Sequence, residues 1–136
     1  ILKDLAGNDR YISGRYAQGA GIHTSVGVLI DQNGDDFYYS SYGVAQGIGH
    51  DFGVGVLADR TGDDSYISGI LSQGAATTGG LGLLLDRAGS DSYSISTNGQ
   101  AYAHDEACSG IMIDLETSGD YLNSRSGKEP VRINIR

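Results

Sequence analysis

Carboxylates recur at a fixed spacing along this chain, and they are the side chains best suited to do chemistry. Each occurrence has the form Asp-x-x-Gly-x-Asp-x-Tyr, with a leading Asp and an inner Asp five residues later. The clearest copy runs from Asp31 to Tyr38. Other copies begin at Asp4, Asp59 and Asp86, and a degraded copy begins at Asp114. Carboxylates gathered in glycine-containing turns supply the oxygen ligands that hard cations such as Ca²⁺ prefer.

The spacing of this motif defines a repeat. The leading aspartates lie 27 or 28 residues apart, and a fixed period of this length indicates a repeat architecture. A Gln-Gly pair recurs in each period, as does a glycine four residues before the leading Asp. That glycine lies in a short apolar run, of which residues 26–30 (VGVLI) are an example. Branched apolar runs that end at Asp and Gly are typical of strands, and the periodicity of a helix is absent.

Each repeat therefore offers three short strands: one at the Tyr, one after Gln-Gly and one before the leading Asp. The period is too short for a propeller blade. The sequence predicts an all-β fold, a parallel β-solenoid (β-helix) with about five coils of 27–28 residues. We expect right-handed coiling and a coil spacing of about 4.8 Å. Residues 1–124 would form the repeats, and residues 125–136 a C-terminal cap or edge strand that Pro130 helps to end.

Stacked coils place equivalent residues in columns. Rings at the Tyr position would stack, and amides at the Gln position would hydrogen-bond one to the next. We expect both columns to be structural. The Tyr column is Tyr11, Tyr38, Tyr66, Tyr93 and Tyr121, and the Gln column is Gln18, Gln46, Gln73 and Gln100.

The apolar strand predicts a partner surface. Side chains alternate between the two faces of a strand, and we expect Val28, Val56, Leu83 and Ile111 to face the core. The column of Leu29, Leu57, Leu84 and Met112 would then face outward beside the recurring glycines. Such an apolar stripe predicts a homo-oligomer, or contact with another domain of the parent protein. The alternative is a strand that bends so that both columns point inward.

Stacking also brings like charges together. One column would hold Asp31, Asp59 and Asp86, and another Asp9, Asp36, Asp64 and Asp91. Two carboxylates about 4.8 Å apart repel by roughly 1 kcal/mol in water and about 3.5 kcal/mol at an effective dielectric near 20. Bound Ca²⁺ would offset this repulsion. Alternatively, each Asp caps its own turn through backbone N–H groups, with Arg60 and Arg87 screening the leading column. Both interpretations remain open at this point.

The turns resemble those of a known family. Gly7-Asn8-Asp9-Arg10-Tyr11 and residues 34–38 (GDDFY) are similar to the second half of the calcium-binding RTX nonapeptide. That resemblance implies a parallel β-roll that binds Ca²⁺ between coils, with Asp9, Asp36, Asp64 and Asp91 as ligands. The match covers about five residues per coil. The period of 27 or 28 residues and the missing Gly-Gly both depart from the RTX pattern.

A catalytic role has few candidates. Parallel β-helices include carbohydrate-active enzymes, and the groups available here are His50-Asp51 and the run His104-Asp105-Glu106. They fall in one loop column two coils apart, with Thr77-Thr78 between them and His23 one position out of step. We expect about 10 Å between them, and no Ser or Cys nucleophile motif accompanies them. Solvated loop residues are the simpler interpretation, so whether the chain is an enzyme stays uncertain.

Composition narrows the partners. The net charge of −8 argues against a nucleic-acid partner, and no apolar run is long enough for a membrane helix. Lone Cys108 excludes an internal disulfide framework. The chain starts at Ile1 inside a repeat, so we expect a piece of a longer protein. We expect a structural or adhesive module of a secreted or cell-surface bacterial protein; the alternative is a carbohydrate-active β-helix enzyme or a carbohydrate-binding module.

Overall fold

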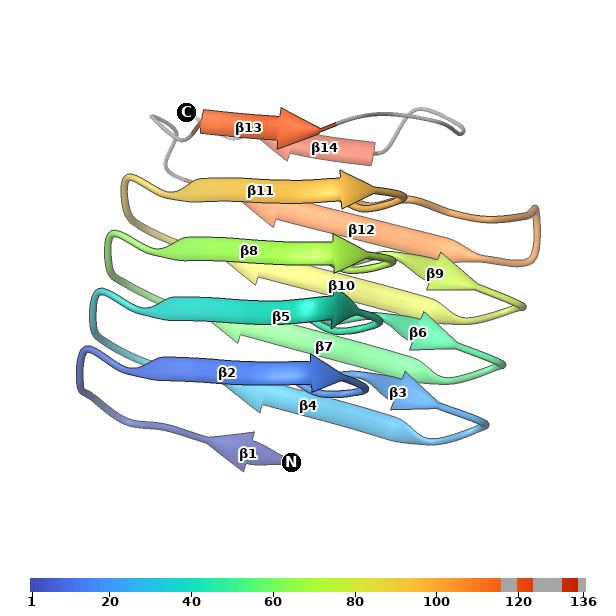
Figure 1. Cartoon of the computed structure of the whole chain (residues 1–136), viewed down its shortest axis with the longest axis horizontal. Coiled ribbons are helices and arrows are strands. Elements are labelled where there is room, and N and C mark those ends of the chain that lie inside the picture. The colour runs from blue at the N-terminus through green and yellow to red at the C-terminus, as the bar shows by residue number, and fades with distance from the viewer. Residues whose placement is uncertain (116–119, 124–130, 135–136) are drawn as a thin grey trace.

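The chain winds into a right-handed parallel β-solenoid. A computed structural model describes residues 1–115, 120–123 and 131–134, which contain strands and no helix. The strands of one wall run to the right in front and those of the other wall return behind, each coil lying above the last (Figure 1). The predicted all-β solenoid is confirmed, with about 4 turns rather than about five coils. No helix in the described residues could span a membrane.

Three coils contribute strands to three parallel sheets, as the three strands per repeat predicted, and the next coil meets the third sheet only through a single bridge between Ala103 and Ala76. Sheet A contains β1 (Leu2–Lys3), β4 (Val26–Ile30), β7 (Val54–Asp59), β10 (Leu81–Asp86), β12 (Ser109–Asp114) and β14 (Val131–Asn134). Sheet B contains β2 (Arg10–Arg15), β5 (Phe37–Gly43), β8 (Ser65–Ile70), β11 (Ser92–Thr97) and β13 (Asp120–Asn123). Sheet C contains β3 (Gly21–Ile22), β6 (Gly49–His50) and β9 (Ala76–Thr77). Equivalent positions of successive repeats pair directly, for example Leu57 with Leu29 and with Leu84.

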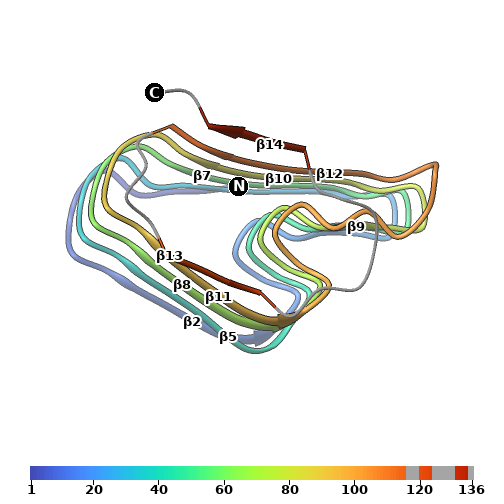
Figure 2. The same ribbon diagram turned by 90° about the horizontal axis from the view of Figure 1, so that it is seen from above.

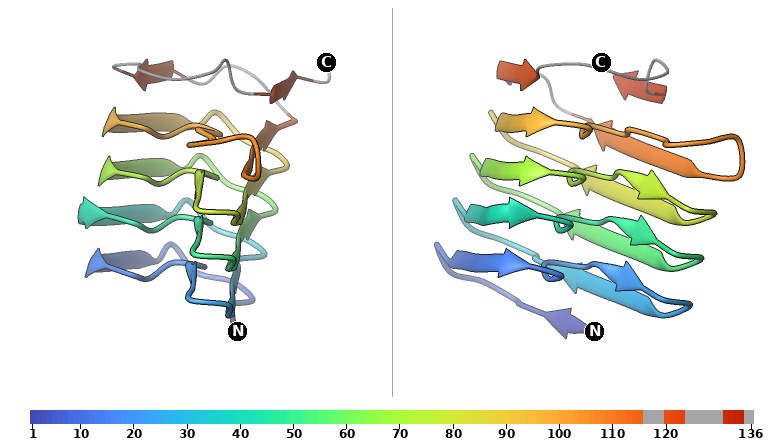
Figure 3. Two further views of the ribbon diagram at one scale, coloured as in Figure 1. Left: turned by 90° about the vertical axis from the view of Figure 1, so that its right-hand side faces the viewer. Right: turned by 45° about the vertical axis from the view of Figure 1, so that its right-hand side comes forward.

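Sheets A and B form two walls, and the segment between them folds inward. Viewed along the stack, the chain leaves sheet B, loops toward sheet A and then follows it outward through sheet C (Figure 2). The same section repeats from coil to coil (Figure 3). The inner loop touches the backbone of sheet A, because a Cβ on Gly55 would lie 1.8 Å from the carbonyl oxygen of Ile48. The recurring glycine of the apolar strand is thus required by this close approach.

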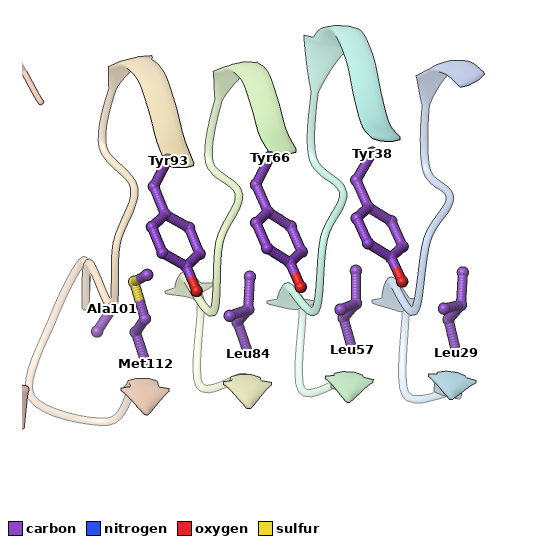
Figure 4. Packing of buried hydrophobic residues seen from close by; sticks show 8 residues of the cluster. All are labelled: Leu29, Tyr38, Leu57, Tyr66, Leu84, Tyr93, Ala101 and Met112. Atoms are coloured by element: carbon purple, nitrogen blue, oxygen red, sulfur yellow. The ribbon is translucent and has the colours of Figure 1, made fainter. Parts of the chain in front are cut away.

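The core lies between the two walls (Figure 4). Sheet B contributes the Tyr column, whose rings are parallel and 4.7–4.9 Å apart from Tyr11 to Tyr93. Tyr66 lies between Tyr38 and Tyr93, as predicted. Sheet A contributes a facing aliphatic column, and both Leu57 and Leu84 are 0% exposed. Aromatic rings and leucines therefore form one continuous apolar column along the stack.

The outward placement predicted for Leu29, Leu57, Leu84 and Met112 is wrong. These residues are 0–3% exposed and belong to the core, and the glycines of the same strands also face inward. The partner interface predicted on them is wrong for the same reason. Val28, Val56, Leu83 and Ile111, predicted to face the core, lie instead on the opposite, partly exposed face of sheet A. The alternation of side chains correctly predicted which residues share a face of sheet A. Which face is buried depends on the contact between the recurring glycine and the inner loop.

The Gln column is buried but differs from the predicted ladder of amides. Gln73 Nε2 donates to the carbonyl oxygens of Tyr66 and Ser94, each at 3.1 Å, so it joins two adjacent strands of sheet B. Gln46 does the same with Tyr38 and Ile67 one coil earlier. The predicted bond from one amide to the next is therefore wrong for these residues. Each Gln has a positive φ of 51–55°, which turns the chain inward after sheet B.

The repeat continues beyond the last full motif. Strand β13 pairs with β11, and β14 pairs with β12, so the two walls each gain a strand. Tyr121 continues the backbone register of Tyr93. The predicted boundary between residues 124 and 125, and Pro130, lie outside the described residues. The assignment of residues 125–136 as a cap therefore stays a prediction.

Candidate metal centre

The acidic turns all lie at one corner of the solenoid, where sheet A passes into sheet B. The leading Asp is the last buried position of the apolar strand, and Asp31, Asp59 and Asp86 are each 0% exposed. The backbone N–H of Asn33 donates to Asp31 Oδ1 at 3.1 Å, and that of Thr61 to Asp59 Oδ1 at 3.2 Å. One oxygen of these two leading carboxylates therefore caps its own turn, as the Asx-turn interpretation predicted.

The glycine of the motif brings the turns into contact. Gly62 has a φ of +151°, which an L side chain rarely adopts. A Cβ there would lie 1.7 Å from the carbonyl oxygen of Gly34 in the preceding turn. The Gly62 N–H donates in turn to the carbonyl of Ala88 in the following coil at 3.0 Å. Successive acidic turns therefore stack backbone to backbone, and this contact holds their carboxylates close together.

The tyrosines bind the second oxygen of the leading carboxylates. The Tyr38 hydroxyl donates to Asp59 Oδ2 at 2.5 Å, and the Tyr66 hydroxyl to Asp86 Oδ2 at 2.7 Å. Tyr11 makes the same contact with Asp31. In each case the Asp belongs to the coil after that of the tyrosine. The Tyr column thus orients the leading carboxylates as well as filling the core, a pairing that the spacing alone did not predict.

The inner aspartates bond across the coils through the main chain. Asp36 Oδ1 accepts the N–H of Asp9 at 2.6 Å, and Asp64 Oδ1 accepts that of Asp36 at 2.6 Å. Asp91 Oδ1 continues the series with the N–H of Asp64 at 2.8 Å. Each inner carboxylate therefore uses one oxygen to join its coil to the preceding one.

The remaining oxygens of the inner aspartates have no donor. Asp36, Asp64 and Asp91 are 2–3% exposed, and Oδ2 of each lacks a hydrogen-bond partner among the described residues. Oδ1 of Asp86 is likewise buried without a partner. Neither Arg60 nor Arg87 forms an ion pair with a described carboxylate, so the predicted screening is not seen. A buried carboxylate oxygen without a donor is costly unless a proton or a cation meets it.

The aspartates of the acidic turns gather into groups of three carboxylates. One oxygen from each member lies within 4.8 Å of the others in Asp31, Asp36 and Asp59, and again in Asp64, Asp86 and Asp91. A third, more exposed group joins Asp9 and Asp31 with Asp4, which the sequence prediction did not include as a ligand. The motif itself marks Asp4, because it is the leading Asp of the first copy. All seven predicted metal ligands thus fall in these groups.

The groups are strongly perturbed acids. Burial raises the pKa of Asp64 to about 9, and the carboxylates of Asp59 and Asp86 add to the shift. Burial likewise raises the pKa of Asp86 to about 7, and those of Asp36, Asp59 and Asp91 to about 6. Two carboxylates can share a hydrogen bond only when one carries a proton. The possible metal ligands in these groups are all carboxylate oxygens, which suit Ca²⁺ better than softer transition metals.

The histidine loop lies elsewhere and is assembled differently. His23 Nδ1 lies 2.9 Å from Asp51 Oδ2, and His50 Nε2 lies 3.7 Å from the same oxygen. His50 Nδ1 also contacts the Thr77 hydroxyl. On the later coil, Asp105 accepts bonds from the Cys108 thiol and from the N–H of Ala107. His23 therefore joins the His50-Asp51 pair, although it is one position out of step in the repeat.

No family model matches the chain, and no curated protein or solved structure matches it.

Proposed function

We propose that this chain is a structural or adhesive module of a secreted or cell-surface bacterial protein, and that its stacked acidic turns bind Ca²⁺. The observation that supports a bound cation is the unpartnered Oδ2 of each buried inner aspartate, Asp36, Asp64 and Asp91. The resemblance of the Gly-x-Asp turns to RTX repeats points to the same ion. Ca²⁺ accepts six to eight oxygens, so carboxylates and turn carbonyls together could complete its coordination.

The mechanical role follows from continuity along the stack. Backbone pairing, the Tyr column and the inner-aspartate bonds each join one coil to the next without interruption from Tyr11 to Tyr93. A stack with such contacts resists bending, which suits a spacer or a rigid adhesive stalk. Bound Ca²⁺ would stabilise this stack by mass action, because the unfolded chain lacks the assembled groups.

A saccharide ligand is a second candidate function. Sheet B presents exposed rings and guanidinium groups near its first coils, where Tyr16 and Tyr42 are 53% and 49% exposed. Arg15 Cζ lies 3.7 Å from the centre of the Tyr42 ring. Exposed aromatic rings with a hydrogen-bonding group beside them suit a sugar. Weaker retention of a Tyr42→Ala variant on an immobilised acidic polysaccharide would support this role, and equal retention would contradict it.

The experiment for the cation compares Asp64→Asn with Asp63→Asn at pH 8. Asp63 is the exposed neighbour of Asp64, and its Oδ1 accepts the N–H of Ser90 in the next coil. We expect Ca²⁺ to raise the Tm of the wild type and of Asp63→Asn, and to raise that of Asp64→Asn far less. In chelator, Asp64→Asn should be at least as stable as the wild type, since it removes the cost of keeping a buried carboxyl protonated at pH 8.

Two results would contradict the proposal. One is the same Tm for the wild type in excess Ca²⁺ and in chelator, which would leave shared protons and Asx turns as the whole explanation. The other is an equal response of both variants to Ca²⁺, which would place the ion away from the inner aspartates. Titration calorimetry on the wild type gives the stoichiometry independently.

A further inference from the structure

The outer face of sheet A is apolar. On β4, β7, β10 and β12, the residues that alternate with the core column form three rows along the stack. The central row is Val28, Val56, Leu83 and Ile111, and every one of its side chains is partly exposed. Val26 and Leu81 of a flanking row are 66% and 38% exposed. No described strand lies over this side of the sheet (Figures 2 and 3).

Charge is missing from this face, although the chain is acidic. The outward positions of the four strands are all aliphatic except Ser109, while the net charge of the chain is −8. Four strands about 4.8 Å apart, with six residues of about 3.3 Å each, give a patch of about 400 Å². A patch of this size is typical of the largest apolar patch on a protein surface, and such a patch is often functional.

We propose that this face of sheet A pairs with the same face of a second copy of the chain. Two such faces would bury about 800 Å² in total, which is the size of a weak, transient interface rather than of a stable one. An aliphatic, uncharged partner is required, and the chain itself supplies one. Both faces have the same spacing between strands, so the rows of one can lie in the grooves of the other, as in sheets packed about 10 Å apart.

The pairing is isologous, with Val56 and Leu83 of the middle strands closest to the two-fold axis. The acidic turns lie at one end of the strands, outside the apolar rows, so their repulsion is felt only at long range. The dimer is therefore weak and becomes tighter as salt screens the charges. This inference is independent of the proposed cation, since it uses only the outer side of the sheet.

The test is sedimentation equilibrium of the wild type, Val56→Asp and Ile67→Asp, from about 10 µM to about 1 mM protein and at two salt concentrations. Ile67 is the matched control, because it is a partly exposed aliphatic residue on the outer face of sheet B in the same coil. We expect dimers for the wild type and for Ile67→Asp, and at least a tenfold weaker association for Val56→Asp. A monomeric wild type throughout, or equal association of the two variants, would overturn the proposal.

A cross-linking measurement avoids the risk that the buried charge prevents folding. Val56→Cys, with Cys108→Ser to remove the native thiol, places a thiol next to the two-fold axis. Mild oxidation should give a covalent dimer, whereas Ile67→Cys in the same background should stay monomeric. Failure of Val56→Cys to cross-link while its far-UV spectrum matches the wild type would also overturn the proposal.

Discussion

Two buried polar columns run along the solenoid, and they meet the cost of burial in different ways. Gln46, Gln73, Asp59 and Asp86 are all 0% exposed. Each of the two amides donates to two main-chain carbonyls, so the Gln column is neutral and its donors are used, although Oε1 of each amide has no partner among the described residues. Burial raises the pKa values of Asp59 and Asp86, and Oδ1 of Asp86 has no donor among the described residues. Identical neutral groups therefore stack without further help, while identical charged groups need protons or a cation.

Tyr66 connects the two columns, so changing it should have the largest effect. Its carbonyl accepts from Gln73, and its hydroxyl donates to Asp86. Tyr66→Ala should lower the free energy of unfolding by about 3–5 kcal/mol, because it removes a fully buried ring from the stack. Tyr66→Phe should cost about 1–3 kcal/mol, since only the donor to Asp86 is lost. Urea denaturation measures both, and a loss below about 1 kcal/mol for Tyr66→Ala would contradict the packing role.

Gln73→Leu tests the neutral column. It keeps most of the side-chain volume and removes the donors to Tyr66 and Ser94, so the free energy of unfolding should fall by about 2–3 kcal/mol. Because no charge is involved, the loss should be the same in Ca²⁺ and in chelator, and the same at pH 5 and pH 8. A loss that depends on Ca²⁺ would mean that the two columns are coupled.

The pH dependence of stability tests the charged column. The folded pKa values of Asp36, Asp64 and Asp86 are about 6, 9 and 7, above the ordinary value of about 3.9. The folded state therefore binds more protons than the unfolded state between about pH 4 and pH 9. In chelator this contribution is complete below about pH 4 and is lost as the pH rises through the folded pKa values.

The expected result in chelator is a Tm that falls from pH 5 to pH 8, because the folded state binds more protons than the unfolded state throughout this range. In excess Ca²⁺ the trend should flatten or reverse, because protons compete with the ion for the same carboxylates. Thermal melts in both conditions measure this. A Tm that rises with pH in chelator would show that the aspartates are not the buried acids described above.

The sequence predicted which residues form the candidate site, but not the hydrogen bonds that they make. The motif alone identified Asp31, Asp36 and Asp59 as neighbours, because a fixed period stacks equivalent residues. It could not show that Tyr38 reaches the Asp of the next coil, or that Asp36 Oδ2 has no donor. Those details depend on how far each coil is displaced along the stack. The Gln column was misjudged for a similar reason, since backbone carbonyls lay closer to its amides than the neighbouring amides did.

The sequence by itself determined the repeat: its period, its three strands per coil and the columns of Tyr, Gln and Asp. A side chain that recurs every 27 or 28 residues must stack on its equivalent once the coils pair in register. The tertiary structure alone decided which face of sheet A is buried. Val56 and Leu57 point to opposite faces of the strand and are both apolar, so the sequence alone does not show which of them faces the core. The inner loop breaks that symmetry, because its backbone meets Gly55 and so turns Gly55, Leu57 and Asp59 inward together.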